Sequence, residues 1–354
     1  MPPEAQAGPL EVRVIDPLEG DAWDRLVRAH PEHSIFQRAA WVRLLHDAYG
    51  HRPCCLQLLR GGAAVALVPL MEVASPLTGR RGVSMPFADF GGILWSQPAA
   101  GEAVAAELLE LARRRRWKHL ELRGGVAPAA GGAVARDWGG HRLDLARPPE
   151  ALWNGLEPAV RRAVRKAEAS GLAVSVGRSA GDVDAYYRLH ARTRRRHGLP
   201  PQPPAFFRQL HRHLIEPGDG EVVLARLGGR AVAGAVFLHS GGAAVYKFGA
   251  SDPRHWPLRP NHLVMWRAIG FLAGEAGCRS LHFGRTAPGD AGLARFKRSW
   301  GSVNEPLAYV RYMVGTRRPG RGAPRATDDH PAVFGFLPVP VNRIIGRLVY
   351  PHLD

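Results

Sequence analysis

One order of predicted secondary structure occurs twice in the chain, and it constrains the fold more than any other sequence feature. In each half, a short alternating strand and two helical segments precede two apolar strands that a pair of glycines separates. These pairs are Gly61-Gly62 and Gly228-Gly229. Two adjacent glycines suit the positive φ angles of a two-residue hairpin turn. A further helix and strand complete each half, which indicates an internal duplication of one mixed α/β unit.

The residue pattern also predicts where each element lies. In the first half we expect strands at 11–16, 54–60, 63–70, 118–123 and 141–145, and helices at 21–29, 36–49 and 101–116. In the second half we expect strands at 172–177, 222–227, 230–238, 243–250, 280–284 and 307–313, and helices at 181–197, 204–214, 261–276 and 291–300. Residues 124–140 are rich in glycine and alanine and are predicted to form a loop.

A chain of 354 residues has room for two domains, at about 100–200 residues per domain. An Arg-Pro-Pro break suggests a boundary that separates residues 1–149 from residues 150–314. A cleft between two such domains is a usual place for a ligand. Residues 315–335 are expected to form a basic linker rich in glycine and proline.

The last segment, 336–354, has an amphipathic pattern. Four apolar side chains can share one helical face there, namely Ile344, Ile345, Leu348 and Val349. Such a face can dock on the body of the protein, and it can also make a peripheral contact with a membrane surface. Docking is the interpretation that we favour.

The balance of charge is strongly basic. The chain has 48 Lys and Arg against 31 Asp and Glu, which gives a net charge of +17. Only four of the 48 are lysines, namely Lys118, Lys166, Lys247 and Lys297. A polyanionic partner such as RNA, a phosphorylated substrate or an acidic membrane surface would explain the charge, and so would a coding bias toward arginine. A lysine that persists in such a chain can mark a place where a compact ammonium is needed.

Several classes of protein are not indicated by the sequence. The chain has no run of about 18 apolar residues, which a membrane-spanning helix would need, and its N-terminal residues do not form a secretory signal. We therefore expect a cytoplasmic protein. Three cysteines are too few for a disulfide framework. The common nucleotide-binding, zinc-protease and serine-hydrolase motifs are absent, and the 16 histidines are scattered. We therefore predict no metal site and no resident cofactor.

Basic residues gather on two helical segments of the second half. Arg161, Arg162, Arg165 and Lys166 form one face of a helix whose opposite side carries Val160 and Val164. This face is a candidate for binding RNA or phosphate, although a solvated charged face has the same pattern. Arg194, Arg195 and Arg196 end the helix at 181–197, where cations also suit the helix dipole.

Two aromatic segments complete the candidate site. Tyr246 and Phe248 are expected to lie on one face of the strand at 243–250. The helix at 261–276 is apolar nearly all round, so it must be central. After the strand at 280–284, a short helix carries Phe296 and the rare Lys297 close to a strand end, where ligands often bind.

The order of these elements resembles a known superfamily. The motifs that carry the resemblance are S-I-F-Q-R-A-A-W (34–41), M-P-F-A-D-F-G-G (85–92), the R-R-x-x-R-K-A-E-x-x-G-L helix (161–172), T-R-R-R-H-G (193–198), V-Y-K-F-G-A-S (245–251) and F-K-R-S-W-G (296–301). Their order is similar to that of the Fem (FemABX) transferases and of FemAB-like proteins of exopolysaccharide gene clusters. These proteins contain the GNAT acyltransferase unit twice, so the resemblance implies an α/β (mixed α+β) fold of two tandem GNAT-like domains, the second of them catalytic.

The resemblance also implies roles for individual residues. Fem enzymes move an amino acid from aminoacyl-tRNA onto an amine of a peptidoglycan precursor. Phe296 and Lys297 match a Phe-Lys pair whose ammonium faces the reacting acyl group, where it would stabilise an oxyanion. Arg196 matches an arginine that contacts substrate phosphate. The other substrate-binding residues that we carry over are Tyr246, Phe248, Asp89, Arg285 and Trp41.

The donor and the class of function leave alternatives. The leading hypothesis is transfer from aminoacyl-tRNA to an amine. That amine belongs to a cell-envelope precursor or a related small molecule, phosphorylated or not. An acyl-CoA-dependent GNAT N-acyltransferase of exopolysaccharide or natural-product biosynthesis is the second. Residues 255–263 lack the glycines of a pyrophosphate loop and contain Pro257, Arg259 and Pro260, which disfavours CoA. The third hypothesis is a non-catalytic, basic nucleic-acid-binding module.

Overall fold

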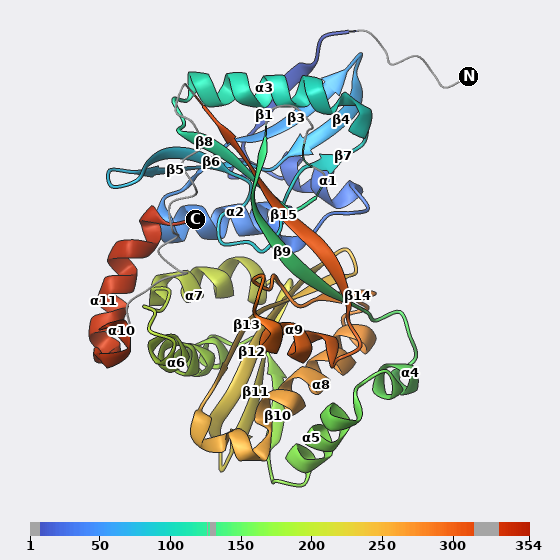
Figure 1. The fold of residues 1–354 in the computed structure, drawn as a ribbon, viewed down its shortest axis with the longest axis vertical. Coiled ribbons are helices and arrows are strands. Elements are labelled where there is room, and N and C mark those ends of the chain that lie inside the picture. The colour runs from blue at the N-terminus through green and yellow to red at the C-terminus, as the bar shows by residue number, and fades with distance from the viewer. Residues whose placement is uncertain (1–7, 126, 128–131, 315–332) are drawn as a thin grey trace. The chain divides into compact units, whose positions relative to one another are not determined.

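The computed structural model describes residues 8–125, 127, 132–314 and 333–354, which divide into two compact units (Figure 1). Of the described residues, the first unit contains those up to Trp138, those from Leu307 to Val314, and Pro351–Asp354. The second unit contains residues 139–306 and 333–350. The contacts thus separate the units at 138/139, eleven residues before the boundary that the Arg-Pro-Pro break suggested. Most of the predicted linker, residues 315–332, lies outside the described residues.

The first unit contains two sheets and three longer helices among its described residues. One sheet has the order β1 (Glu11–Ile15), β3 (Cys55–Arg60), β4 (Ala63–Val68) and β7 (Leu94–Trp95). The other has the order β2 (Arg52–Pro53), β5 (Met71–Ser75), β6 (Gly79–Val83), β8 (His119–Arg123) and the end of β15 (Val303–Met313). The helices are α1 (Ala22–Ala29), α2 (Ala39–Tyr49) and α3 (Gly101–Arg114). A buried cluster that includes Leu56, Val68, Leu108 and Trp117 packs α3 against the strands.

The second unit is one sheet with helices on both faces (Figure 1). Its strands have the order β10 (Ala173–Gly177), β11 (Gly220–Leu227), β12 (Arg230–Ser240), β13 (Ala243–Ser251), β14 (Ser280–His282) and the end of β9 (Ala133–Asp144). Its helices are α4 (Pro149–Asn154), α5 (Pro158–Glu168), α6 (Ala180–Arg196), α7 (Pro204–Leu210), α8 (Pro260–Gly274), α9 (Ala291–Arg298), α10 (Val333–Phe336) and α11 (Val339–Val349). The buried face of α8, which includes Leu263, Met265 and Ile269, packs in the main core of this unit.

The same crossover occurs in each unit, which confirms the predicted duplication of a mixed α/β fold. In the first unit β6 pairs in parallel with β8, and the connection between them contains β7 and then α3. In the second unit β13 pairs in parallel with β14, and α8 connects them. The next strand along the chain does not stay in its own repeat. β9 follows β8 but pairs with β14, whereas β15 follows β14 but pairs with β8.

Both glycine-pair hairpins form as predicted. Gly61 and Gly62 have φ angles of 55° and 79° between β3 and β4, and Gly228 and Gly229 have φ angles of 54° and 76° between β11 and β12. Two successive positive φ angles are a conformation that residues with a Cβ rarely adopt. The glycine pairs therefore determine where each hairpin turns.

The structure corrects one prediction about the first half and adds two strands that were not predicted. Residues 133–140 belong to the strand β9, although glycine and alanine there suggested a loop. The first residues of β9 are mostly exposed, so they lack the alternation of buried apolar side chains by which a strand is found. The strands β5 and β6 were not predicted. The sequence of β6, G-R-R-G-V, has little apolar character, and Arg81 is buried there because it donates to the carbonyl oxygen of His352.

The C-terminal helix docks as predicted but uses a different face. Asn342 and Gly346 of α11 are buried, and a Cβ at Gly346 would come within 2.1 Å of the Pro201 carbonyl oxygen. Ile344 and Leu348, which were predicted to share an apolar face, are 62% and 65% exposed. No helix in the described part of the chain is both long and apolar enough to cross a membrane.

We predict that burial of His190 makes the protein sensitive to acid. The imidazole packs against Tyr186, Phe207 and Phe248, with Nε2 2.8 Å from Gln202 Oε1. Burial and then the charge of Arg194 lower its pKa to about 3. Because the unfolded imidazole binds a proton near pH 6.5 and the folded one does not, the free energy of unfolding is unaffected above that pH and falls as the pH decreases from 6.5 toward 3.

The His190→Leu variant tests this. The free energy of unfolding is compared between pH 8 and pH 4.5 in each protein. The loss on going to pH 4.5 should be about 2 kcal/mol smaller in the variant than in the wild type. Urea unfolding at the two pH values measures the difference. Equal losses in the two proteins would contradict the prediction, because they would assign the acid sensitivity to other groups.

Candidate active site

A buried lysine holds the loop that follows β14. Lys297 lies on α9 and is only 3% exposed. Its Nζ donates hydrogen bonds to the carbonyl oxygens of Gly284, at 2.8 Å, and Arg285, at 2.9 Å. The Asp290 side chain accepts from the Leu293 amide and so begins α9 at a defined point. The ammonium therefore connects the helix to the end of the strand before it.

The predicted partner of this lysine, Phe296, faces the beginning of α8. Its ring centroid lies 6.3 Å from that of His262 and 6.2 Å from that of Trp300. The His262 and Trp300 rings are 6.0 Å apart, and Trp300 is fully buried. These contacts place Phe296 against the first turn of α8.

A histidine and a glutamate support the same loop, and sequence reasoning missed both. His282 Nδ1 accepts a hydrogen bond from the Gly284 amide at 2.9 Å, so the proton of the neutral ring is on Nε2. That Nε2 lies 3.1 Å from Glu305 Oε1, and Arg142 Nε lies 3.0 Å from Glu305 Oε2. Burial raises the pKa of Glu305, but the hydrogen bonds from His282 and Arg142 outweigh it, so the pKa is lowered overall. The carboxylate is thus charged at neutral pH.

A second missed histidine feels the charge of Lys297. His141, on β9, is 1% exposed, and its Nδ1 is 3.4 Å from Thr286 Oγ1. Burial, followed by the positive charge of Lys297, lowers its pKa to about 4. The ring is therefore neutral at pH 7. No spacing in the sequence could have identified His141, His282 and Glu305, because β9, β14 and β15 bring them together from distant positions.

Of the three arginines at the end of α6, two hold the C-terminal segment and one faces the solvent. Arg194 Nη2 donates to the Tyr350 hydroxyl at 3.0 Å, and Arg195 Nε donates to the Gly335 carbonyl oxygen at 3.2 Å. Arg196, the predicted phosphate contact, is exposed. Its guanidinium donates to the Ser251 carbonyl oxygen at 3.1 Å and lies 5.1 Å from the centroid of the Trp256 ring.

The predicted aromatic pair does not lie on one face of its strand. Phe248 packs against His190, Phe206 and Phe207, whereas Tyr246 packs against Phe237 and Phe283. The pairing of β12 with β13 shifts register between Val236 and Phe237, which inserts one extra residue between the two aromatic positions. Such a bulge breaks the two-residue alternation on which the prediction depended. Burial also raises the pKa of Tyr246 to about 12.

The basic face of α5 forms as predicted. Val160, Val164 and Ala167 are buried, while Arg162, Arg165 and Lys166 are exposed and Arg161 is half-buried. The Arg165 guanidinium lies 5.5 Å from the centroid of the Trp153 ring. Binding of RNA or phosphate by this face stays a prediction.

The remaining predicted residues have structural contacts. Trp41, in the first unit, is fully buried, and its Nε1 donates to the Pro86 carbonyl oxygen at 3.2 Å. Asp89 of the same unit accepts a hydrogen bond from Tyr309 through its backbone carbonyl, at 2.7 Å. Arg285 is half-buried in the second unit, where its carbonyl oxygen binds Lys297. Among the described residues, no group of three or more His, Cys, Asp and Glu side chains is arranged to hold a metal ion.

Three positions at the beginning of α8 offer no free backbone donor for a pyrophosphate. Pro260, its first residue, has no N–H. The amides of Arg259 and His262 donate to the carbonyl oxygens of Trp256 and Arg259. Arg259 itself has a φ angle of 60°. A phosphate-binding helix N-terminus needs free N–H groups that point at the anion, and these three positions do not provide them.

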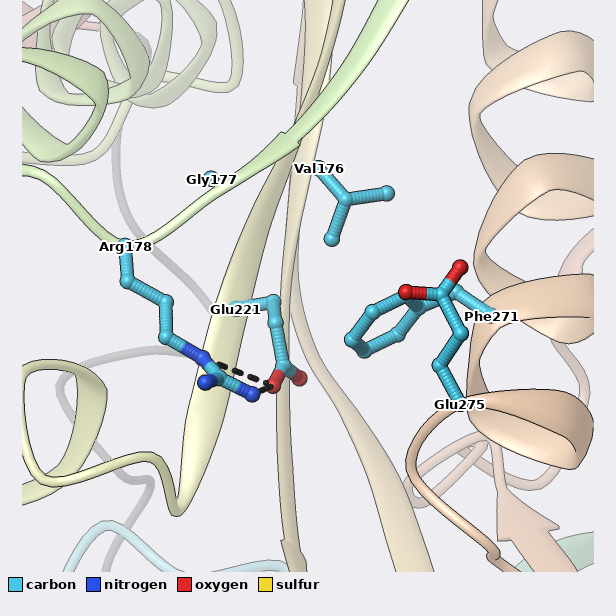
Figure 2. Close-up of a pocket in the computed structure, with 6 residues that line it drawn as sticks. All are labelled: Val176, Gly177, Arg178, Glu221, Phe271 and Glu275. Carbon is cyan, nitrogen blue, oxygen red and sulfur yellow. Dashed lines mark hydrogen bonds and ion pairs between the residues drawn. The ribbon is translucent and has the colours of Figure 1, made fainter.

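A cavity of about 380 Å³ lies away from the lysine (Figure 2). Val176, Gly177, Arg178, Glu221, Phe271 and Glu275 line it. Figure 2 shows the Arg178 guanidinium against the buried Glu221 carboxylate, whose Oε1 is 3.2 Å from Arg178 Nε and 3.1 Å from His239 Nε2. Phe271 follows His262 by nine residues on α8, or about 14 Å along the helix axis. This cavity therefore belongs to the opposite end of α8 from Phe296.

Comparison with known proteins identifies the fold. Residues 158–298 match the sequence profile of a family described as acetyltransferase (GNAT) domain. The crystal structure of FemX superposes with a TM-score of 0.68 at 17% identity, and the match covers 86% of this chain and 97% of FemX. No match was found among curated protein sequences.

Two further solved structures have the same fold. A tandem GNAT protein from the clavulanic acid biosynthesis pathway superposes with a TM-score of 0.55 at 15% identity, over 87% of this chain and 100% of that protein. L-PGS from Bacillus licheniformis superposes with a TM-score of 0.51 at 12% identity, over 87% and 96% of the two chains. The fold is therefore that of tandem GNAT proteins, and the resemblance to GNAT and Fem proteins is confirmed.

We predict that Lys297 contributes to stability as well as to the site. Lys297→Met keeps the length of the side chain but leaves two buried carbonyl oxygens without their charged donor. The free energy of unfolding should fall by about 2–4 kcal/mol. The matched control is Lys166→Met on the exposed face of α5, which should change it by less than about 0.5 kcal/mol. Equal stability of the two variants in urea unfolding would show that the bonds of Lys297 contribute little.

Proposed function

We propose that the protein is an N-acyltransferase that moves an aminoacyl group from aminoacyl-tRNA to an amine of a cell-envelope precursor or a related small molecule. The observation that carries the proposal is the buried ammonium of Lys297. It lies inside the segment that matches the GNAT domain profile and at the position that resembles the Phe-Lys pair of Fem proteins. The fold similarity to FemX supports the same reaction class.

A cation near the carbonyl that is attacked would favour the proposed reaction. The amine nitrogen forms a bond to the ester carbon, and the carbonyl oxygen becomes an oxyanion. When the intermediate collapses, the bond to the ribose oxygen breaks, and that oxygen takes up the proton that the nitrogen releases. A cation that is already fixed, in a site from which water is excluded, stabilises the oxyanion without further rearrangement.

The contacts of Lys297 suit this role. The Gly284 and Arg285 carbonyl oxygens fix Nζ before any substrate binds. After burial, the positive charge of Lys297 is the next cause of the lowered pKa of His141. His282 and Glu305 are positioning residues, since they support the loop that Lys297 binds.

The donor is inferred from the beginning of α8 and from the charge of the chain. Acyl-CoA would need backbone N–H groups for its pyrophosphate, and Pro260, Arg259 and His262 do not supply them. RNA instead needs an extended basic surface, which the face of α5 and a net charge of +17 provide. Transfer from acyl-CoA remains the alternative, because the matched profile is that of an acetyltransferase domain.

We predict that transfer depends on the ammonium of Lys297. Single-turnover transfer from a pool of aminoacyl-tRNA to a lysine-containing acceptor peptide should slow by about 100- to 1000-fold in Lys297→Met, normalised to folded protein. Lys118→Met, in the first unit and outside both the candidate site and the face of α5, is the control for loss of a lysine charge and should keep most of the rate. A rate for Lys297→Met within threefold of the wild type would refute the oxyanion role, even if the variant is less stable.

We also predict that the protein binds tRNA in preference to acetyl-CoA. Filter binding with deacylated tRNA should give an affinity that falls steeply as salt increases, because bound phosphates release counterions. Calorimetry with acetyl-CoA under the same conditions should show no saturable binding at micromolar concentrations. Micromolar binding of acetyl-CoA, together with weak and salt-independent retention of RNA, would reverse the choice of donor.

A further inference from the structure

Four arginines surround a second cavity in the second unit. This cavity, of about 260 Å³, lies between α6 and the hairpin that joins β11 to β12. Arg188 and Arg192 come from α6, Arg226 from β11 and Arg230 from β12. We call it the arginine pocket. None of these arginines was singled out by the motifs of the sequence.

Most of the positive charge in the arginine pocket is not neutralised by the protein. Arg188, Arg192 and Arg230 are exposed, and their side chains make no hydrogen bond or ion pair with any described residue. Arg226 is the exception, because its Nη2 lies 3.3 Å from Asp182 Oδ1. Three guanidinium groups therefore line a cavity without an acidic partner.

This arrangement has an electrostatic cost and no visible structural benefit. Arg188 and Arg192 are four residues apart on α6, so their like charges share one face and destabilise the helix slightly. By contrast, Arg194 and Arg195 of the same helix each bind a residue of the C-terminal segment. An anion in the arginine pocket would remove the repulsion and give the guanidinium groups hydrogen-bond acceptors.

The shape of the arginine pocket suits a phosphate group. Guanidinium groups donate two parallel hydrogen bonds to phosphate oxygens, and several can converge on one group. Gly229, at the turn of the hairpin, also lines the cavity, and nothing lies within 4 Å of the place where its Cβ would be. The backbone there is open to close approach by a ligand.

A row of arginines connects the arginine pocket to the predicted phosphate contact. Arg188, Arg192 and Arg196 succeed each other at intervals of four on α6, or about 6 Å of helix rise per step. Arg196 reaches the Ser251 carbonyl oxygen at the end of β13, and Ser251 pairs with Ala233 near the start of β12. The arginine pocket and Arg196 therefore lie at the same end of the sheet.

We propose that the arginine pocket binds phosphate groups of the acyl donor, and that these belong to the backbone of an RNA. The identity of the donor rests on the proposed function, but the phosphate chemistry of the pocket does not. The phosphates of a nucleic-acid strand recur at regular short intervals, so a row of arginines on one helix face can contact more than one of them.

Two matched double variants test the proposal. Arg188→Gln/Arg192→Gln removes two charges from the arginine pocket. Arg208→Gln/Arg212→Gln removes two charges at the same interval of four residues, from exposed arginines outside the arginine pocket that have no described side-chain partner. Each protein is titrated with inorganic pyrophosphate in a calorimeter and with deacylated tRNA in filter binding between 50 and about 300 mM salt.

The pocket variant should lose pyrophosphate binding and bind tRNA about tenfold more weakly, with the slope of log K against log salt reduced by about 1.4–1.8. The control variant should bind pyrophosphate like the wild type and keep a slope within about 0.5 of it. Equal behaviour of the two variants toward both ligands overturns the arginine pocket, whether or not aminoacyl transfer is found. If the two variants differ only toward pyrophosphate, the arginine pocket binds a small phosphorylated molecule and its assignment to RNA is overturned. The proposal that tRNA is the donor is then decided by the binding of tRNA to the wild-type protein.

Discussion

The buried ammonium of Lys297 is the interaction on which the second unit's candidate site depends. A lysine with 3% exposure is retained only because two carbonyl oxygens, of Gly284 and Arg285, replace its hydration. The same bonds fix the loop after β14, which His282 supports from the other side through the Gly284 amide. One charge thus fixes the loop after β14 against α9 and, after burial, helps to lower the pKa of His141.

The elements with strong local signals could be predicted, and those that depend on distant contacts could not. Gly-Gly turns are local, so both hairpins were found, and so was the apolar helix α8. The exposed beginning of β9 and the arginine-containing β6 lack a local apolar pattern. At the site, Lys297 was found through its rarity and its motif. Its carbonyl partners, and the cluster of His282 and Glu305, exist only after three separate strands have assembled.

The large excess of arginine is divided between two uses. Some arginines are buried in the fold. Arg123, for example, is 1% exposed and forms ion pairs with Glu121 and Asp354. Such pairs stabilise the fold only when every charge has a partner. Others stay unpaired and converge, as they do between α6 and the β11–β12 hairpin. A coding bias can raise the total number of arginines, but it does not explain why three unpaired ones line a single cavity.

The exchange of β9 and β15 between the repeats has a consequence for the newly synthesised chain. β8 ends at Arg123, and its partner residues in β15 begin at Tyr309, roughly 190 residues later. At about 5–20 residues per second, a ribosome needs roughly 10–40 s to add them. During that interval β8 has an unpaired edge that can join another chain. The order of the strands along the gene, and not their stability, therefore determines how long the nascent protein is exposed to misassembly.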